Sequence, residues 1–95
     1  GADAAIGTTY NIMPKIYLEM RHAFDAGDLD LARTCQLHAN RVIRILIEVG
    51  VLAGVKAMLG WRGTPVGPPR VAPALDETGE RILRAELDGL DFDVI

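Results

Sequence analysis

The sequence predicts a small, mainly α-helical fold, with a short N-terminal strand followed by about four helices. Apolar residues recur at spacings of three and four along most of the chain, and glycines and prolines divide it into segments of helical length. Only residues 4–10 contain the short apolar run that is typical of a strand. With 95 residues, the chain is long enough for a single helical domain spanning 1–95.

The strand candidate at 4–10 reads Ala-Ala-Ile-Gly-Thr-Thr-Tyr. It lacks polar alternation, as expected of a strand buried on both faces. The pattern predicts no second strand for it to pair with, and a strand without a neighbour leaves its backbone groups unpaired. Because the chain also begins at Gly1 rather than at a methionine, we expect it to be a piece of a larger protein.

The first two helices should form an antiparallel hairpin. Pro14 suits a first helical turn and Gly27 a stop, which predicts a helix at about 14–26. Asp28 then caps a helix at about 29–49. The apolar face of the first helix comprises Ile12, Ile16, Met20, Ala23 and Phe24. The apolar stripe of the second helix is wider, which indicates a central position in the fold or a subunit interface. It comprises Leu31, Cys35, Ala39, Val42, Ile43, Ile45, Leu46, Ile47 and Val49.

Two shorter helices complete the pattern. Flanking glycines predict a helix at about 51–59, and a loop at 60–73 holds four of the five prolines. Asp76 or Thr78 caps a last helix at about 77–88. Its inward-facing residues are expected to be Ile82, Leu83 and Leu87. Beyond it, residues 91–95 either fray or are held by Phe92.

Composition argues against several classes of function. The net charge of −3 and the lack of a basic cluster argue against nucleic acid, and no apolar run approaches the ~20 residues that span a membrane. Cys35 is the only cysteine, which suits a reduced, cytoplasmic compartment. Because a core of this size is marginal, we expect self-association into a homo-oligomer, for which exchange of helices between copies is one route.

The reactive residue types show no catalytic pattern. Lys15 and Lys56 fit structural roles, and His22 and His38 lie on different helices without ligand spacing. We therefore expect no metal and no cofactor. Cys35 falls on an apolar stripe, where a thiol acts as a small hydrophobe. Trp61, beside Arg62, is equally compatible with a lid over the core and with an interface anchor.

An ordered set of motifs resembles one family. The set comprises Ile-Gly-Thr-Thr-Tyr-Asn at 6–11, a proline-led helix with Tyr17, the turn at 26–28, the segment 51–59 with Lys56, and Pro68-Pro-Arg70 before Pro73. It resembles the C-terminal third of the N-acetylneuraminate lyase and dihydrodipicolinate synthase family of pyruvate-dependent class I aldolases. Residues 7–11 are closer to the sialic-acid lyase branch.

The resemblance implies strand eight, helix eight and the extra C-terminal helices of a (β/α)8 barrel, which is incomplete as a barrel. The parent reaction would be reversible aldol cleavage releasing pyruvate, through a Schiff base on a lysine of the sixth strand. That lysine lies before Gly1 in the family pattern, so the resemblance implies no catalytic residue here and no activity of the chain alone. A small keto-acid or sugar-acid substrate would bind only to the full-length parent.

Two positions of the family's substrate site are retained. Thr8 matches a serine or threonine that hydrogen-bonds substrate hydroxyls, and Ile6 matches an apolar residue whose backbone lines the pyruvate pocket. Thr8 also has a simpler interpretation, which we favour for the isolated chain: its hydroxyl caps the following turn.

A second hypothesis is a stand-alone helical module that self-associates and has no enzyme activity. The unpaired strand and the wide apolar stripe of the second helix motivate it, because both need partners that one copy lacks.

Overall fold

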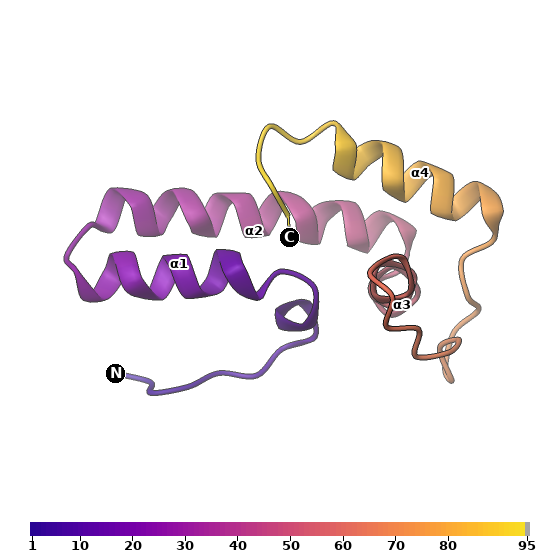
Figure 1. Ribbon diagram of the computed structural model, residues 1–95, viewed down its shortest axis with the longest axis horizontal. Helices are drawn as coiled ribbons and strands as arrows, with labels where there is room; N and C mark the ends of the chain where they lie inside the picture. The colour runs from indigo at the N-terminus through magenta and orange to yellow at the C-terminus, as the bar shows by residue number, and fades with distance from the viewer. Residues whose placement is uncertain (95) are drawn as a thin grey trace.

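The computed structural model describes residues 1–94, which form four α-helices and one 3₁₀ turn (Figure 1). The helices are α1 (Pro14–Asp25), α2 (Leu29–Val49), α3 (Val51–Trp61) and α4 (Glu77–Asp88), and the 3₁₀ turn is η1 (Thr8–Asn11). α1 and α2 lie side by side and antiparallel, α3 runs across the end of α2, and α4 lies along the C-terminal half of α2. The long helix α2 thus contacts each of the other three.

The strand predicted at 4–10 is wrong. Residues 1–7 run alongside α1 without forming a strand, and Thr8–Asn11 closes into η1 (Figure 1). The Tyr10 amide donates to the Gly7 carbonyl at 3.2 Å, which starts the turn. A strand exists only where a neighbour accepts and donates its backbone hydrogen bonds, and residues 1–94 offer none. Apolar character therefore misled the prediction.

The helical hairpin forms as predicted, because its signals are local. α1 begins at Pro14 and ends at Asp25, one residue before the predicted boundary. Gly27 adopts the left-handed conformation at φ +80°, which favours glycine. The Asp28 carboxylate accepts a hydrogen bond from the Leu31 amide at 3.0 Å and caps α2.

α3 and α4 also lie where the sequence predicts helices. α3 runs through Gly60 and ends at Trp61, two residues later than predicted, so the loop begins at Arg62. At the far end of that loop, the Asp76 carboxylate accepts from the Gly79 amide at 2.7 Å and caps α4. Asp76, rather than Thr78, is therefore the capping residue.

The core lies where α2 meets the other helices. Its fully buried large side chains are Ile12, Met13, Val42, Leu46 and Leu83. Three predicted inward residues lie mostly outside it: Phe24 is 63% exposed, Ile47 65% and Ile82 51%. The helices bury only part of their apolar surface, and apolar residues at the edge of a packed face remain in solvent. No helix among residues 1–94 has the length and hydropathy to cross a membrane.

Candidate functional site

The two predicted substrate-binding residues lie in the N-terminal segment, residues 1–11. Ile6 is completely exposed, at 100% of its reference surface, and Thr8 is also exposed. They lie close together in sequence, at the point where the extended residues 1–7 give way to η1. As substrate ligands, both remain predictions.

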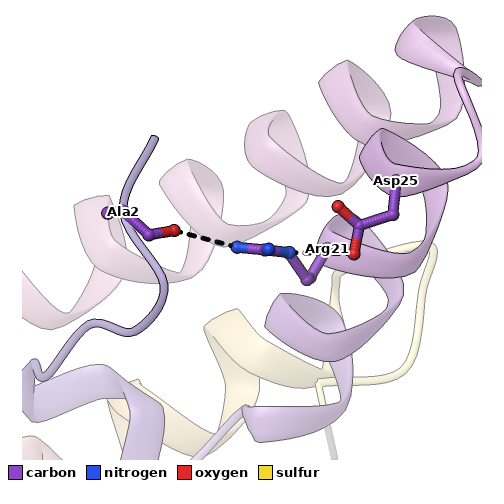
Figure 2. A network of polar contacts seen from close by, with 3 residues as sticks. All are labelled: Ala2, Arg21 and Asp25. Carbon is purple, nitrogen blue, oxygen red and sulfur yellow. Dashed lines mark hydrogen bonds and ion pairs between the residues drawn. The ribbon is translucent and has the colours of Figure 1, made fainter.

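Arg21 holds the start of this segment against α1. Its Nη1 donates to the Ala2 carbonyl at 3.1 Å, while its Nε pairs with the Asp25 carboxylate at 2.9 Å (Figure 2). Asp25 thereby orients the guanidinium from one turn along the helix. An exposed pair of this kind contributes little to stability, but it directs the segment along the helix.

Tyr17 holds the other end of the segment. Its hydroxyl and that of Thr9 lie 2.7 Å apart, and its ring meets that of Tyr10 edge-on, with centroids 4.2 Å apart at 64°. Both contacts are specific and directional. Thr9 thus bonds the segment to α1, whereas η1 has no side-chain cap of the kind predicted for the Thr8 hydroxyl.

Asn11 fixes the backbone of η1. Its side-chain amide donates to the Thr8 carbonyl at 3.0 Å, and the Ile12 and Met13 amides both donate to the Thr9 carbonyl at 3.1 Å. Because Ile12 and Met13 are fully buried, the segment has a rigid base from Thr9 onward. Residues 1–8 form an exposed arm on that base.

Sequence reasoning did not predict the contacts of Arg21, Thr9 or Asn11. For Arg21 the available signal was its spacing of four from Asp25, which predicts an ion pair on a helix. Its bond to Ala2 spans 19 positions, and no periodicity reports such a contact. For Asn11 the signal was its type, since asparagine commonly bonds to backbone in turns.

Lys15 and His22 belong to α1, whereas Lys56 and His38 lie on other helices. Lys56 donates to the Pro68 carbonyl at 3.2 Å and joins α3 to the proline-rich loop, whereas Lys15 is exposed on α1. The His38 ring stacks on Phe92, with centroids 3.9 Å apart. Across residues 1–94, no cluster of three or more His, Cys, Asp or Glu side chains is placed to hold a metal ion.

Cys35 is a packing residue. It is 4% exposed within the core, and burial, together with the charge of Glu19, raises the pKa of its thiol. A thiol with a raised pKa stays protonated at neutral pH and is a poor nucleophile.

Trp61 packs against the core between α3 and α4. Its indole donates to the Glu80 carboxylate at 3.4 Å, and the Arg84 guanidinium lies 4.4 Å above its ring. Trp61 therefore covers part of the core, as the first of its two interpretations predicts, and its role as an interface anchor stays a prediction.

Comparison with known proteins shows which family the chain is similar to. The sequence model of the dihydrodipicolinate synthetase family matches residues 1–86. The chain is 51% identical over 70 residues to the N-acetylneuraminate lyase of Rhizobium meliloti, an alignment covering 74% of this chain and 23% of that protein. It is 48% identical over 69 residues to N-acetylneuraminate lyase 2 of Escherichia coli O6:H1, covering 70% of this chain and 23% of that protein.

The fold is also similar to part of a solved structure. The N-acetylneuraminate lyase of Proteus mirabilis superposes on 97% of this chain with a TM-score of 0.85 and 31% identity, and the match covers 32% of the Proteus chain. The present chain spans about a quarter of the length of the curated relatives it matches.

Proposed function

The chain belongs to the dihydrodipicolinate synthetase family, and we propose that it is the C-terminal part of an N-acetylneuraminate-lyase-like Schiff-base aldolase. The parent reaction is reversible aldol cleavage that releases pyruvate. The main support is the similarity to the Proteus mirabilis lyase, because it extends over 97% of this chain at a TM-score of 0.85. The identity of 51% to the Rhizobium meliloti enzyme supports the lyase branch.

In this proposal, the N-terminal segment is this chain's contribution to the substrate site. The backbone of Ile6 lines the pyruvate pocket, and the Thr8 hydroxyl binds a substrate hydroxyl. Their exposure supports this role, as does the rigid base formed by Thr9 and Tyr17. The rest of the barrel would pack against this segment and enclose Ile6 and Thr8.

The chain alone is proposed to be inactive. A Schiff-base lysine needs a desolvated pocket that lowers the pKa of its ammonium. Lys15 is exposed, and the Lys56 ammonium already donates to the Pro68 carbonyl. Incubation with pyruvate and borohydride should leave both lysines unmodified, and a covalent adduct on either would contradict this part of the proposal.

Complementation tests the proposal as a whole. The Rhizobium meliloti lyase, truncated before the region that matches this chain, is co-expressed with the chain. We expect each part alone to release no pyruvate from N-acetylneuraminate and the purified pair to release it, as measured by coupled oxidation of a nicotinamide cofactor. A stable but inactive pair would overturn the catalytic assignment.

Variants of the chain then test the role of Thr8. Thr8→Val should lower kcat/KM of the reconstituted pair by about tenfold to a hundredfold, because it removes one substrate hydrogen bond. Thr8→Ser should retain most of the activity. Thr34→Val is the matched control, since the Thr34 hydroxyl only donates to the Asp30 carbonyl within α2. Equal activity of Thr8→Val and Thr34→Val would exclude Thr8 from the site.

A second candidate function is self-association as a helical module. The exposed side chains of Phe24 (63%), Leu37 (57%) and Ile47 (65%) favour it, because large apolar residues on α1 and α2 remain in solvent. Light scattering of the chain alone provides the test. A dimer or larger assembly would support the module, and a sharply melting monomer would contradict it. Both candidates suit a reduced, cytoplasmic setting, since Cys35 is a free thiol.

A further inference from the structure

Thr8 is an exposed residue whose backbone is held on both sides. The Gly7 carbonyl, in the peptide group before Thr8, accepts a hydrogen bond from the Tyr10 amide at 3.2 Å. The Thr8 carbonyl, in the peptide group after it, accepts one from the side-chain amide of Asn11 at 3.0 Å. Rotation about either soft dihedral angle of Thr8 would move one of these peptide groups. The two hydrogen bonds therefore restrain the direction in which the Thr8 side chain leaves the backbone.

The residue after Thr8 is attached to the core. The Thr9 carbonyl accepts hydrogen bonds from the Ile12 and Met13 amides at 3.1 Å, and both of these residues are fully buried. The Thr9 hydroxyl also lies 2.7 Å from the Tyr17 hydroxyl on α1. The restrained backbone of Thr8 is thus connected to a rigid support, although Thr8 has an exposed side chain.

Asn11 supplies the side-chain contact that acts directly on the backbone of Thr8. Asn11 is itself exposed, so its hydrogen bond contributes little to the free energy of unfolding, because water competes for both partners. A bond of this kind restrains geometry more than it stabilises the fold. Restraint is useful where a hydroxyl must meet a substrate, since a preorganised group loses less freedom on binding.

A simpler role for Asn11 is to stabilise η1, since asparagine commonly bonds to backbone in turns. The two roles differ in how they depend on the Thr8 hydroxyl. If Asn11 only stabilises the turn, its loss affects the protein equally whichever residue stands at position 8. If Asn11 orients Thr8, its loss matters only while the Thr8 hydroxyl is present.

We propose that Asn11 is a positioning residue for Thr8 in the substrate site, an inference that rests on the proposed function. By holding the Thr8 carbonyl, Asn11 orients the Thr8 hydroxyl toward a hydroxyl of the sugar-acid substrate. Asn11 acts through Thr8 and contacts no reacting atom itself.

A double-mutant cycle in the reconstituted pair tests this role. Asn11→Asp keeps the size of the side chain but replaces the amide donor with an acceptor, and Asn11→Ala removes the donor without adding charge. With Thr8 present, we expect each to lower kcat/KM for N-acetylneuraminate by about tenfold. In the Thr8→Val background, each should change kcat/KM by less than about twofold, because no hydroxyl remains to be oriented. An equal loss in both backgrounds, or no loss in either, would overturn the inference.

Asn40→Asp is the matched control. Asn40 is an exposed asparagine on α2, and its Oδ1 accepts from the Gln36 side chain at 2.9 Å, a role that a carboxylate retains. This variant should leave kcat/KM of the pair unchanged. A loss equal to that of Asn11→Asp would show that the added charge, rather than the lost donor, is responsible, and would overturn the inference.

Measurements on the chain alone separate this inference from the proposed function. The Thr9 amide belongs to the same peptide group as the Thr8 carbonyl, so NMR relaxation should show a lower order parameter there in Asn11→Asp. The melting temperature should stay within about 4 °C of that of the unaltered chain. An unchanged order parameter would overturn this inference alone. An unaltered pair without activity would overturn the proposed function, and this inference with it.

Discussion

The Arg41 guanidinium donates to the Asp91 carboxylate at 2.8 Å, across 50 positions of sequence, and so joins the C-terminal residues to the middle of α2. Phe92 strengthens this connection, because its ring stacks on His38 and lies 5.3 Å below the Arg41 guanidinium. Of the two expectations for the C-terminus, attachment through Phe92 is therefore correct as far as Val94, which is only 9% exposed. Ile95 lies outside the described residues.

Acid should release this attachment. The hydrogen bond from Arg41 is the main cause that lowers the pKa of the Asp91 carboxyl below its ordinary value. A carboxyl whose pKa is lower in the folded state stabilises at pH above its unfolded pKa, about 3.9, and that stabilisation is lost as pH falls through the folded value. The Phe92 ring resonances in NMR spectra should then move toward their unfolded positions while Leu83 methyls stay native. In Asp91→Asn this acid transition of the Phe92 resonances should be absent. If the variant shows the same transition, Asp91 is not the group that titrates.

Gly54 is required where α3 approaches α2. A Cβ at this position would lie 2.7 Å from Leu46 Cδ2 and 3.3 Å from Val49 Cγ2, and Leu46 is fully buried. We expect Gly54→Ala to lower the free energy of unfolding by about 1–3 kcal/mol through overpacking. Gly60→Ala, in the same helix with open space around it, should raise that free energy by about 0.5–1 kcal/mol. Denaturant unfolding measures the free energy of unfolding of both variants. Equal changes in the two would show that α3 does not approach Leu46 closely at Gly54.

The hydrogen bond between Thr9 and Tyr17 should appear in a double-mutant cycle. Thr9→Val and Tyr17→Phe each remove one partner, and each should cost about 1 kcal/mol of unfolding free energy. Because they break the same bond, the double variant should cost little more than either single one. Tyr10→Phe, which keeps its ring against Tyr17, is the control and should change stability by less than about 0.5 kcal/mol. If the double variant loses the full sum of the two single costs in unfolding free energy, Thr9 and Tyr17 do not share this hydrogen bond.

The Cys35 thiol should be protected in the folded chain. Desolvation is the largest cause of its raised pKa, so a reagent that needs the thiolate should react only when the core opens. Since the folded pKa exceeds the unfolded value of about 8.5, stability should also fall as pH rises through the folded value. The measurement is the labelling rate with an aromatic disulfide as denaturant is raised. If the Cys35 thiol of the native chain is labelled as fast as that of the unfolded chain, the thiol is not buried.

The helices were predictable because their signals are local. Pro14 begins α1, Gly27 turns the chain, and Asp28 and Asp76 cap α2 and α4 with their own side chains. Each signal acts within about one helical turn, where residue type alone determines the geometry. The family resemblance, shown by the match over residues 1–86, was equally accessible in the ordered motifs.

The errors arose where the outcome depends on distant neighbours. Residues 4–10 have the composition of a strand, but pairing needs a second strand that residues 1–94 do not provide. Phe24 and Ile82 have the spacing of core residues, yet the width of the packed stripe depends on the facing helix. Likewise, among residues 1–94 the Nη2 atom of Arg62 is buried without a hydrogen-bond partner, which no spacing in the sequence indicates.

The exposed arm and the core meet within a few residues, so the two parts of the chain can be altered separately. Residues 1–8 contain no buried side chain, whereas Ile12 and Met13 have lost all their exposure. A substitution in the arm therefore opens no cavity in the helical core. The side chains of the arm can be exchanged to probe chemistry while the helices stay folded.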